Sequence, residues 1–163
     1  MVSSEYQPSY VFIAGYQDLT DQEFAAHYEG EIDDAINNGS SFLLSDEPGA
    51  CTRALEYIQA KNISESRISF YKSSNATNTN APTNLNVSQI HTVPSGETER
   101  YVAMAKKSDT HIIWLRPGDT LDDQGCISAS DVLDMQFSGA VEAMRAVWAK
   151  KMQEAMDFYD TIV

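Results

Sequence analysis

The chain has few basic residues, and it has no long apolar run. Eleven Lys and Arg residues face 24 Asp and Glu residues in a chain of 163, which gives a formal net charge of −13. A field of this sign repels phosphate backbones and anionic lipid surfaces, so we expect neither nucleic acid nor a membrane as a partner. No stretch has the roughly 20 apolar residues that span a bilayer, and the first residues lack the basic and apolar segments of a secretion signal. We therefore expect a cytoplasmic protein.

Cysteine is also scarce, and the acidic residues show no metal-binding spacing. Cys51 and Cys126 are the two cysteines, too few for a disulfide framework or a cysteine metal cluster. The three histidines are dispersed without ligand spacing. Asp119, Asp122 and Asp123 form an acidic turn whose spacing does not match a calcium loop. We predict no metal and no cofactor.

Short apolar runs alternate along the chain with patterns of helical period. The apolar runs predict strands over 10–14, 41–44, 67–71 and 109–115. The helical patterns cover 21–38, 51–61, a segment that begins near 95, and 129–159. Alternation with short connections predicts one α/β domain over residues 1–163. Its architecture would be a Rossmann-like three-layer α/β/α fold with a parallel sheet.

Three segments stand apart from this alternation. Residues 1–8 are polar, and we expect a frayed terminus. Residues 72–95 are rich in Asn, Thr and Ser, which predicts a long polar loop; a mobile segment is favoured over a binding flap or an interface arm. Residues 129–160 predict C-terminal helices with a long stripe of Met and aromatic side chains. That stripe fits core packing or contact with a second subunit, and we expect a homo-oligomer formed through these helices.

Strand, turn and helix in residues 10–38 form the first unit of a nucleotide-binding α/β fold. Ligands of open α/β sheets sit past the carboxyl ends of the strands, where Gly15, Tyr16 and Gln17 follow the first strand. The turn after the second strand contains Pro48 and Gly49, and a glycine there lets a backbone approach a ligand closely. These residues predict a small-molecule site at one rim of the sheet.

Four further side chains are candidates for the same crevice. Cys51 and Arg53 begin the second helix, Arg100 lies early in the third helix, and Arg116 ends the fourth strand. A cysteine at a helix N-terminus can have a lowered thiol pKa, although such cysteines are more often small buried residues. Arg100 could equally pair with a nearby carboxylate, and Arg116 could lie in solvent.

Three motifs resemble the SLOG superfamily of Rossmann-like proteins. They are Val11–Gly15, the phrase Asp46-Glu47-Pro48-Gly49-Ala50, and Glu97 to Asp109 with its Glu-Arg pair at 99–100. The superfamily includes the LOG phosphoribohydrolases and the DNA-processing protein A fold, and nucleoside deoxyribosyltransferases are related to it. The resemblance covers about 10–118 and implies a nucleotide-derived ligand.

The chain departs from this family at the positions that carry its chemistry. The turn arginine of the family corresponds to Gln17, its Gly-Asp to Ser45-Asp46, and the aspartate after its Gly-Ala to Cys51. Its Ser-Gly-Thr phosphate turn has only a loose counterpart in 125–130. Because glutamine cannot replace the charge of arginine beside a phosphate, these departures predict an altered phosphate site.

The related enzymes cleave N-glycosidic bonds with a carboxylate near the anomeric carbon. By resemblance Glu99 and Asp46 are the candidate catalytic residues. Glu99 also fits a helix-capping role, and Asp46 a turn-forming role.

The sequence leaves three hypotheses open. The first is a binding module for a nucleotide-derived small molecule, without strong catalysis. The second is an N-glycoside hydrolase or deoxyribosyltransferase that acts on nucleoside phosphates. The third is a self-assembling or interaction protein that has lost the ligand site. The missing arginine and the missing Ser-Gly-Thr turn favour the first and third hypotheses over the second. The presence of Gly15, Pro48-Gly49 and Arg100 favours the first over the third.

Overall fold

The computed structural model describes residues 9–74, 90–94, 97–117 and 139–162, and it confirms an α/β fold. Five strands form one sheet in the order β4-β3-β2-β1-β5, and every neighbouring pair is parallel. The strands are β1 (Tyr10–Ala14), β2 (Ser41–Ser45), β3 (Ile68–Ser73), β4 (Ile90–Val93) and β5 (Thr110–Ile113). The predicted parallel arrangement is therefore confirmed.

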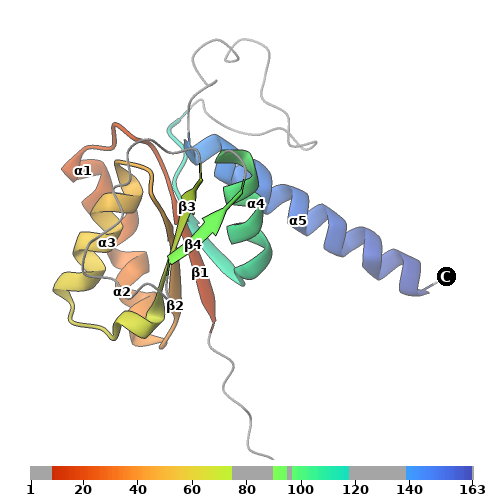
Figure 1. Cartoon of the computed structure of the whole chain (residues 1–163), viewed down its shortest axis with the longest axis horizontal. Coiled ribbons are helices and arrows are strands. Elements are labelled where there is room, and N and C mark those ends of the chain that lie inside the picture. The colour runs from red at the N-terminus through yellow and green to blue at the C-terminus, as the bar shows by residue number, and fades with distance from the viewer. Residues whose placement is uncertain (1–8, 75–89, 95–96, 118–138, 163) are drawn as a thin grey trace, which may run out of the picture.

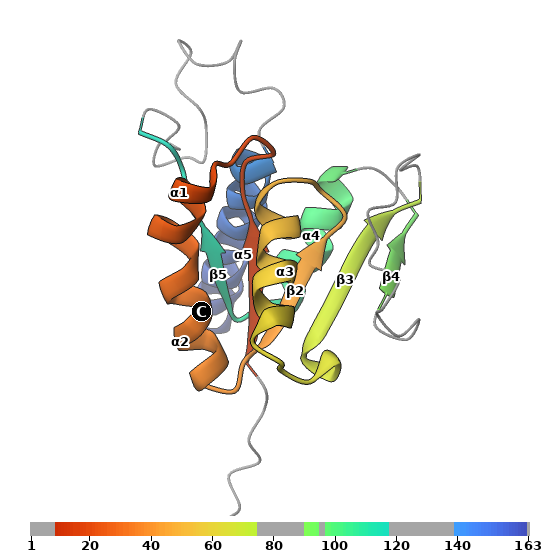
Figure 2. The same cartoon turned by 90° about the vertical axis from the view of Figure 1, so that its left-hand side faces the viewer.

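Helices cover both faces of the sheet. The helices that begin the chain and those that end it lie on opposite faces (Figure 1). The helical segments are α1 (Asp21–Phe24), η1 (Ala25–Glu29), α2 (Gly30–Asn37), α3 (Ala50–Ala60), η2 (Glu65–Arg67), α4 (Glu97–Lys107) and α5 (Gly139–Ile162). Figure 2 shows α1, α2 and α3 in front of the sheet, with α4 and α5 behind it. This is the expected three-layer architecture.

Alternating side chains of β1 build the two halves of the core. Val11 and Ile13 pack with residues of α1, η1, α2 and α3, whereas Phe12 and Ala14 pack with residues of α4 and α5. All four are at most 3% exposed. A strand buried on both faces is continuously apolar, which is why residues 10–14 could be assigned from sequence.

The prediction of a polar loop over 72–95 is wrong for residues 72–73, which belong to β3, and for residues 90–93, which form β4. This strand pairs with β3, from Phe70 opposite Ile90 to Ser73 opposite Val93. Ile90 and Val93 are half-buried, whereas His91 and Thr92 are exposed. A short edge strand with two polar residues shows little of the apolar pattern that marks a strand. Residues 75–89 of the predicted loop lie outside the described residues, as do the predicted frayed terminus 1–8 and residues 129–138 of the predicted C-terminal helices.

β1 is the strand at which the order of the sheet reverses. Chain connections from β1 through β2 and β3 to β4 run outward on one side, and α4 then returns to β5 on the other side of β1. The loops that leave β1 and β5 therefore separate at the carboxyl rim. In open α/β sheets such a reversal is where ligands bind.

Tyr28 fills the gap between the ends of β1 and β5. Its hydroxyl donates to the carbonyl of Ala14 (3.0 Å) and accepts from the amide of Trp114 (3.3 Å). The side chain is fully buried, and its ring stacks on Phe24. Tyr28 belongs to η1, a π-helical turn that interrupts the helix between α1 and α2. One hydroxyl thus satisfies two backbone groups that have left the sheet ladder.

Gly15 makes room for this tyrosine. A Cβ at Gly15 would lie 2.6 Å from the Cβ of Ala50 and still closer to the hydroxyl oxygen of Tyr28. We predict that Gly15→Ala lowers the free energy of unfolding by roughly 1–3 kcal/mol, because overpacking forces neighbours to shift. Gly30→Ala should instead raise it by about 0.5–1 kcal/mol, since Gly30 lies in a helix with open space around its Cα.

Urea denaturation of both variants tests this explanation. Adding Tyr28→Phe to Gly15→Ala removes the hydroxyl that the new methyl group would meet, so the two changes together should cost less than the sum of their separate effects. Strict additivity would show that Gly15 is needed for another reason.

Candidate functional site

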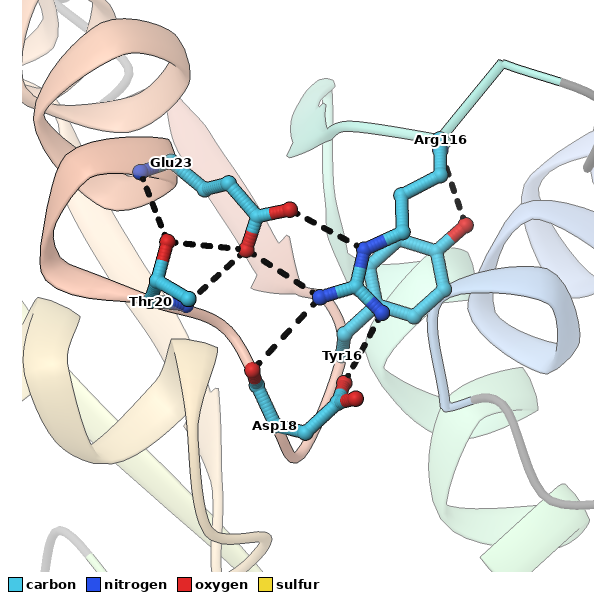
Figure 3. Close-up of polar contacts among 5 residues, drawn as sticks. All are labelled: Tyr16, Asp18, Thr20, Glu23 and Arg116. Carbon is cyan, nitrogen blue, oxygen red and sulfur yellow. Dashed lines mark hydrogen bonds and ion pairs between the residues drawn. The ribbon is translucent and has the colours of Figure 1, made fainter.

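The carboxyl rim of β1 and β5 carries an exposed ion-pair group centred on Arg116. Its guanidinium lies between the turn after β1 and the start of α1 (Figure 3). Nε and Nη2 each lie 3.1 Å from an oxygen of Glu23, and Nη1 lies 3.0 Å from Asp18. The side chain of Arg116 is 29% exposed and that of Asp18 is 78% exposed. We name Arg116, Asp18 and Glu23 the rim triad.

Tyr16 supports the rim triad from beneath. The guanidinium carbon lies 4.3 Å from the centre of the Tyr16 ring, a cation–π contact. The hydroxyl of Tyr16 accepts from the backbone amide of Arg116 (2.9 Å). Tyr16 itself is 5% exposed, so the loops after β1 and β5 are held together at a fixed separation.

Glu23 is held by two partners at once. Its carboxylate accepts the bidentate pair from Arg116 and a bond from the backbone amide of Thr20 (2.9 Å). The amide of Glu23 in turn donates to the Thr20 hydroxyl (3.2 Å), which completes a capping box. The hydrogen bond from Arg116, followed by that from Thr20, lowers the pKa of Glu23 from 4.5 to about 2. The hydrogen bond to Glu23 in turn raises the pKa of Arg116.

A second polar group is closed inside the protein between the end of β2 and α4. Arg100 pairs with Asp46, and its Nη2 lies 3.1 Å from Glu47. Tyr101 donates its hydroxyl to the second oxygen of Glu47. All four side chains are at most 6% exposed. We name Arg100, Asp46, Glu47 and Tyr101 the buried cluster; it holds one cation and two carboxyl groups.

Cys51 lies close to the buried cluster and is itself buried. The thiol lies 3.2 Å from the Ser45 hydroxyl and 3.4 Å from the carbonyl oxygen of Ile13. Burial, and then the charge of Glu47, raises the pKa of Cys51 to about 11. A lowered thiol pKa, one of the two possibilities for this helix start, is therefore not found, because desolvation disfavours the thiolate more than the helix start favours it.

The turn after β2 packs against the turn after β1. Gly49 has φ +82°, and a Cβ there would lie 2.5 Å from the carbonyl oxygen of Gln17 and closer to that of Tyr16. The next amide, of Ala50, donates to the carbonyl of Tyr16 (3.2 Å). The close approach that Gly49 permits is thus to the chain's own backbone, whereas the sequence suggested a ligand. Pro48 is exposed at the tip of this turn.

The remaining predicted residues are spread along the rim. Arg53 pairs with Asp21 at the start of α1. Gln17 is exposed beside Asp18, and Glu99 is exposed on α4. Of the two candidate catalytic carboxylates, Glu99 therefore faces solvent while Asp46 is 6% exposed. The structure brings Asp46, Cys51 and Arg100 together, and it places Arg116 and Tyr16 in a separate group.

Sequence reasoning missed Asp18, Glu47 and Tyr101 as members of these groups. Glu47 stands next to Asp46, and Tyr101 next to Arg100, so each motif already contained the missing partner. Pairing across 54 positions of sequence is not visible without the fold. Glu23 was recognisable as a cap but not as the partner of an arginine 93 positions away.

Three grooves in the described part of the chain are lined by residues of β5, away from both groups, and two of them are clearly larger than the third. One, of about 470 Å³, is at the amino rim, where Ser9, Asn38 and Thr110 contribute to its walls. The other, of about 310 Å³, is lined by Glu31, by Asp34 and by the stacked rings of His27 and Trp114, whose centres are 4.0 Å apart. Within the described residues, no group of three His, Cys, Asp or Glu side chains is placed to hold a metal ion.

Comparison of the chain with protein-family models, with curated proteins and with solved structures finds no match. The resemblance of the three motifs to the SLOG superfamily therefore stays a prediction.

The buried cluster makes Arg100 a sensitive position. Arg100→Met leaves two buried carboxyl groups without a cation and should lower the free energy of unfolding by roughly 3–5 kcal/mol. Arg145→Gln, which breaks an exposed pair with Glu142, should change it by less than about 1 kcal/mol. Chemical denaturation measures both.

A triple variant separates charge from packing. Arg100→Met combined with Asp46→Asn and Glu47→Gln should recover a large part of the loss, because the uncompensated charge is gone. A triple variant as unstable as Arg100→Met would mean that the lost packing of the guanidinium dominates.

The lowered pKa of Glu23 predicts a pH dependence of known sign. A carboxyl group whose pKa falls on folding stabilises the folded state above its unfolded pKa, and this contribution is lost as pH drops toward the folded pKa. The stability difference between wild type and Glu23→Gln should be constant above about pH 4.5 and shrink between pH 4.5 and 2. Urea denaturation over this range measures it. In an Arg116→Gln background most of the pH dependence should vanish; if it persists unchanged, Arg116 is not its cause.

Proposed function

We propose that this chain is a binding protein for a small nucleotide-derived molecule, held at the carboxyl rim between β1 and β5, and that it is not a strong catalyst. The observation that carries the proposal is the position of Arg116. Its guanidinium is partly exposed at the point where the strand order reverses, beside the turn that follows β1. Ligands of open α/β sheets bind at this point.

Arg116 supplies the charge that Gln17 lacks. In the SLOG proteins that the chain resembles, an arginine stands at the position of Gln17. Here a guanidinium reaches the same turn from the loop after β5, and its Nη2 approaches the carbonyl of Asp18 at 3.5 Å. A planar guanidinium binds phosphate or carboxylate in bidentate fashion. An altered phosphate site with a relocated arginine is consistent with both the resemblance and the departure from it.

Glu23 then acts as a resident anion. It already forms with Arg116 the bidentate contact that a phosphate would form, in a place where both partners are about a quarter exposed. An incoming phosphate must displace this carboxylate, so binding is weakened by the stability of the rim triad. The carboxylates of Asp18 and Glu23 repel an anion. The ligand therefore needs contacts from its sugar or base to displace Glu23 from Arg116.

The geometry gives less support to an N-glycoside hydrolase. Such chemistry needs a carboxylate that reaches the sugar, with a second group to hold or protonate it. Asp46 is held by Arg100 inside the protein, and Glu99 stands in solvent on α4. A self-assembling protein remains a second candidate, because the exposed half of α5 offers it a surface.

A thermal-shift panel of nucleoside mono- and diphosphates tests the proposal. A ligand at 100 times its Kd stabilises the folded state by about 2.7 kcal/mol, which is a rise of several degrees in Tm for a domain of this size. Arg116→Gln should weaken binding by roughly 10- to 100-fold, the loss of one charge-assisted contact. Glu23→Gln should strengthen it, because the resident anion is gone.

Arg145→Gln is the matched control. Arg145 also pairs with a carboxylate, that of Glu142, and its side chain is 43% exposed, but it lies on α5 and outside the rim triad. It should bind like wild type. If no nucleotide in the panel shifts the Tm of wild type or of Glu23→Gln, the proposal fails. Mass spectrometry of small molecules that accompany the purified protein would identify a ligand outside the panel.

A further inference from the structure

The carboxyl-terminal half of α5 leaves the body of the protein. The first half of the helix packs on α4 and β5 through Ala140, Val141, Ala143 and Val147, all at most 6% exposed. From Lys151 to Thr161 every residue is exposed. Figure 1 shows this half projecting away from the sheet. An isolated helix of about this length is only marginally stable in water, so we expect a partner to cover it.

The projecting half carries a continuous apolar face. Met152 is 44% exposed, Met156 57%, Phe158 63% and Tyr159 69%. With the half-buried Trp148 and with Ala155, three of these residues continue a stripe at spacings of three and four, which is the pattern that one helix presents to another. Phe158 lies at one border of the stripe.

Charge favours a second copy of this chain on that face. The molecule carries 24 acidic residues against 11 basic ones, so two copies repel each other over most of their surfaces. The stripe itself has no carboxylate. By the period of the helix, Glu154 and Asp157 lie on the other side, whereas Lys151 borders the stripe on one edge and Asp160 on the other. α5 as a whole holds three basic and four acidic residues, which is close to neutral.

The order of the charges along α5 also indicates whether two such helices would pack parallel or antiparallel. After Glu142, which pairs with Arg145, the basic residues Lys150 and Lys151 come first and three acidic residues follow them. Two antiparallel helices bring the basic part of each near the acidic part of the other, whereas parallel helices align like with like. Antiparallel helix dipoles add to this preference. We propose that two copies of this chain associate through the projecting halves of α5, packed antiparallel about a two-fold axis near Met152–Met156.

The proposed dimer does not depend on whether the carboxyl rim binds a ligand. Sedimentation velocity of the full chain over a range of concentrations tests it. Wild type should shift from monomer to dimer as concentration rises. Tyr159→Glu places a carboxylate on the apolar face and should weaken the dimer by at least about tenfold in Kd. Thr161→Glu adds the same charge two residues away on the opposite side of the helix and should leave the dimer unchanged. Circular dichroism checks that both variants keep the fold.

A spin label tests the direction. With Cys126→Ser and Asp160→Cys, the introduced thiol lies at the border of the stripe and is the accessible one, since Cys51 is buried. Antiparallel packing separates the two labels by roughly 18 Å along the helices, from a rise of 1.5 Å per residue, while parallel packing brings them side by side. A monomer at every concentration, equal weakening by the two glutamates, or adjacent labels would each overturn the proposal as stated.

Discussion

One hydroxyl group holds together the place where the sheet reverses. The strands β1 and β5 separate past Ala14 and Ile113, and a carbonyl on one side and an amide on the other would lose their ladder partners there. Tyr28 serves both groups and is itself fully buried. Burial raises the pKa of its hydroxyl, so the group stays protonated and can donate and accept at once. A glycine is favoured at residue 15, because a Cβ there would meet both the tyrosine hydroxyl and Ala50.

The carboxyl rim is otherwise organised by arginines that join distant segments. Arg100 ties α4 to the turn after β2, and Arg116 ties the loop after β5 to the turn after β1. The two differ in exposure, and this difference decides what each can do. Exchanging a partner of Arg100 means exposing or abandoning buried carboxyl groups, at several kcal/mol. Arg116 lies in solvent reach, where ion pairs are worth about 1 kcal/mol or less, so a ligand can compete for it.

The fold could be predicted from sequence where a residue pattern fits only one kind of secondary structure. The apolar runs 10–14 and 41–44 fit only buried strands, and the structure places β1 and β2 there. β4 was missed because an edge strand needs few apolar residues. The π-helical turn that positions Tyr28 was not predictable either. The apolar spacing indicates a helix, but it does not show that one turn contains an extra residue.

Sequence reasoning could predict which residues lie near the candidate site, but not which of them contact one another. Sequence reasoning chose Arg100, Asp46, Cys51, Tyr16 and Arg116 and expected one crevice. These residues do lie past the ends of β1, β2 and β5 or against them. However, α4 closes over Asp46, Cys51 and Arg100, whereas Arg116 stays partly exposed above the buried Tyr16. Which of two arginines meets water depends on the packing of a helix, and a sequence motif does not encode it.

In the rim triad, the carboxylates of Asp18 and Glu23 already occupy the guanidinium that an anionic ligand would have to bind. This limits which ligands the proposed site could hold. Two carboxylates surround one guanidinium, so the group has an excess of negative charge before any ligand arrives. A bare phosphate gains the arginine but must overcome both carboxylates, and it would bind poorly. A nucleoside phosphate adds sugar hydroxyls that can donate to the exposed Asp18, which turns one of the two repulsive groups into a binding partner. Discrimination between the two is therefore expected from the hydrogen-bond donors of the sugar, and it favours ligands that carry both an anion and neighbouring hydrogen-bond donors.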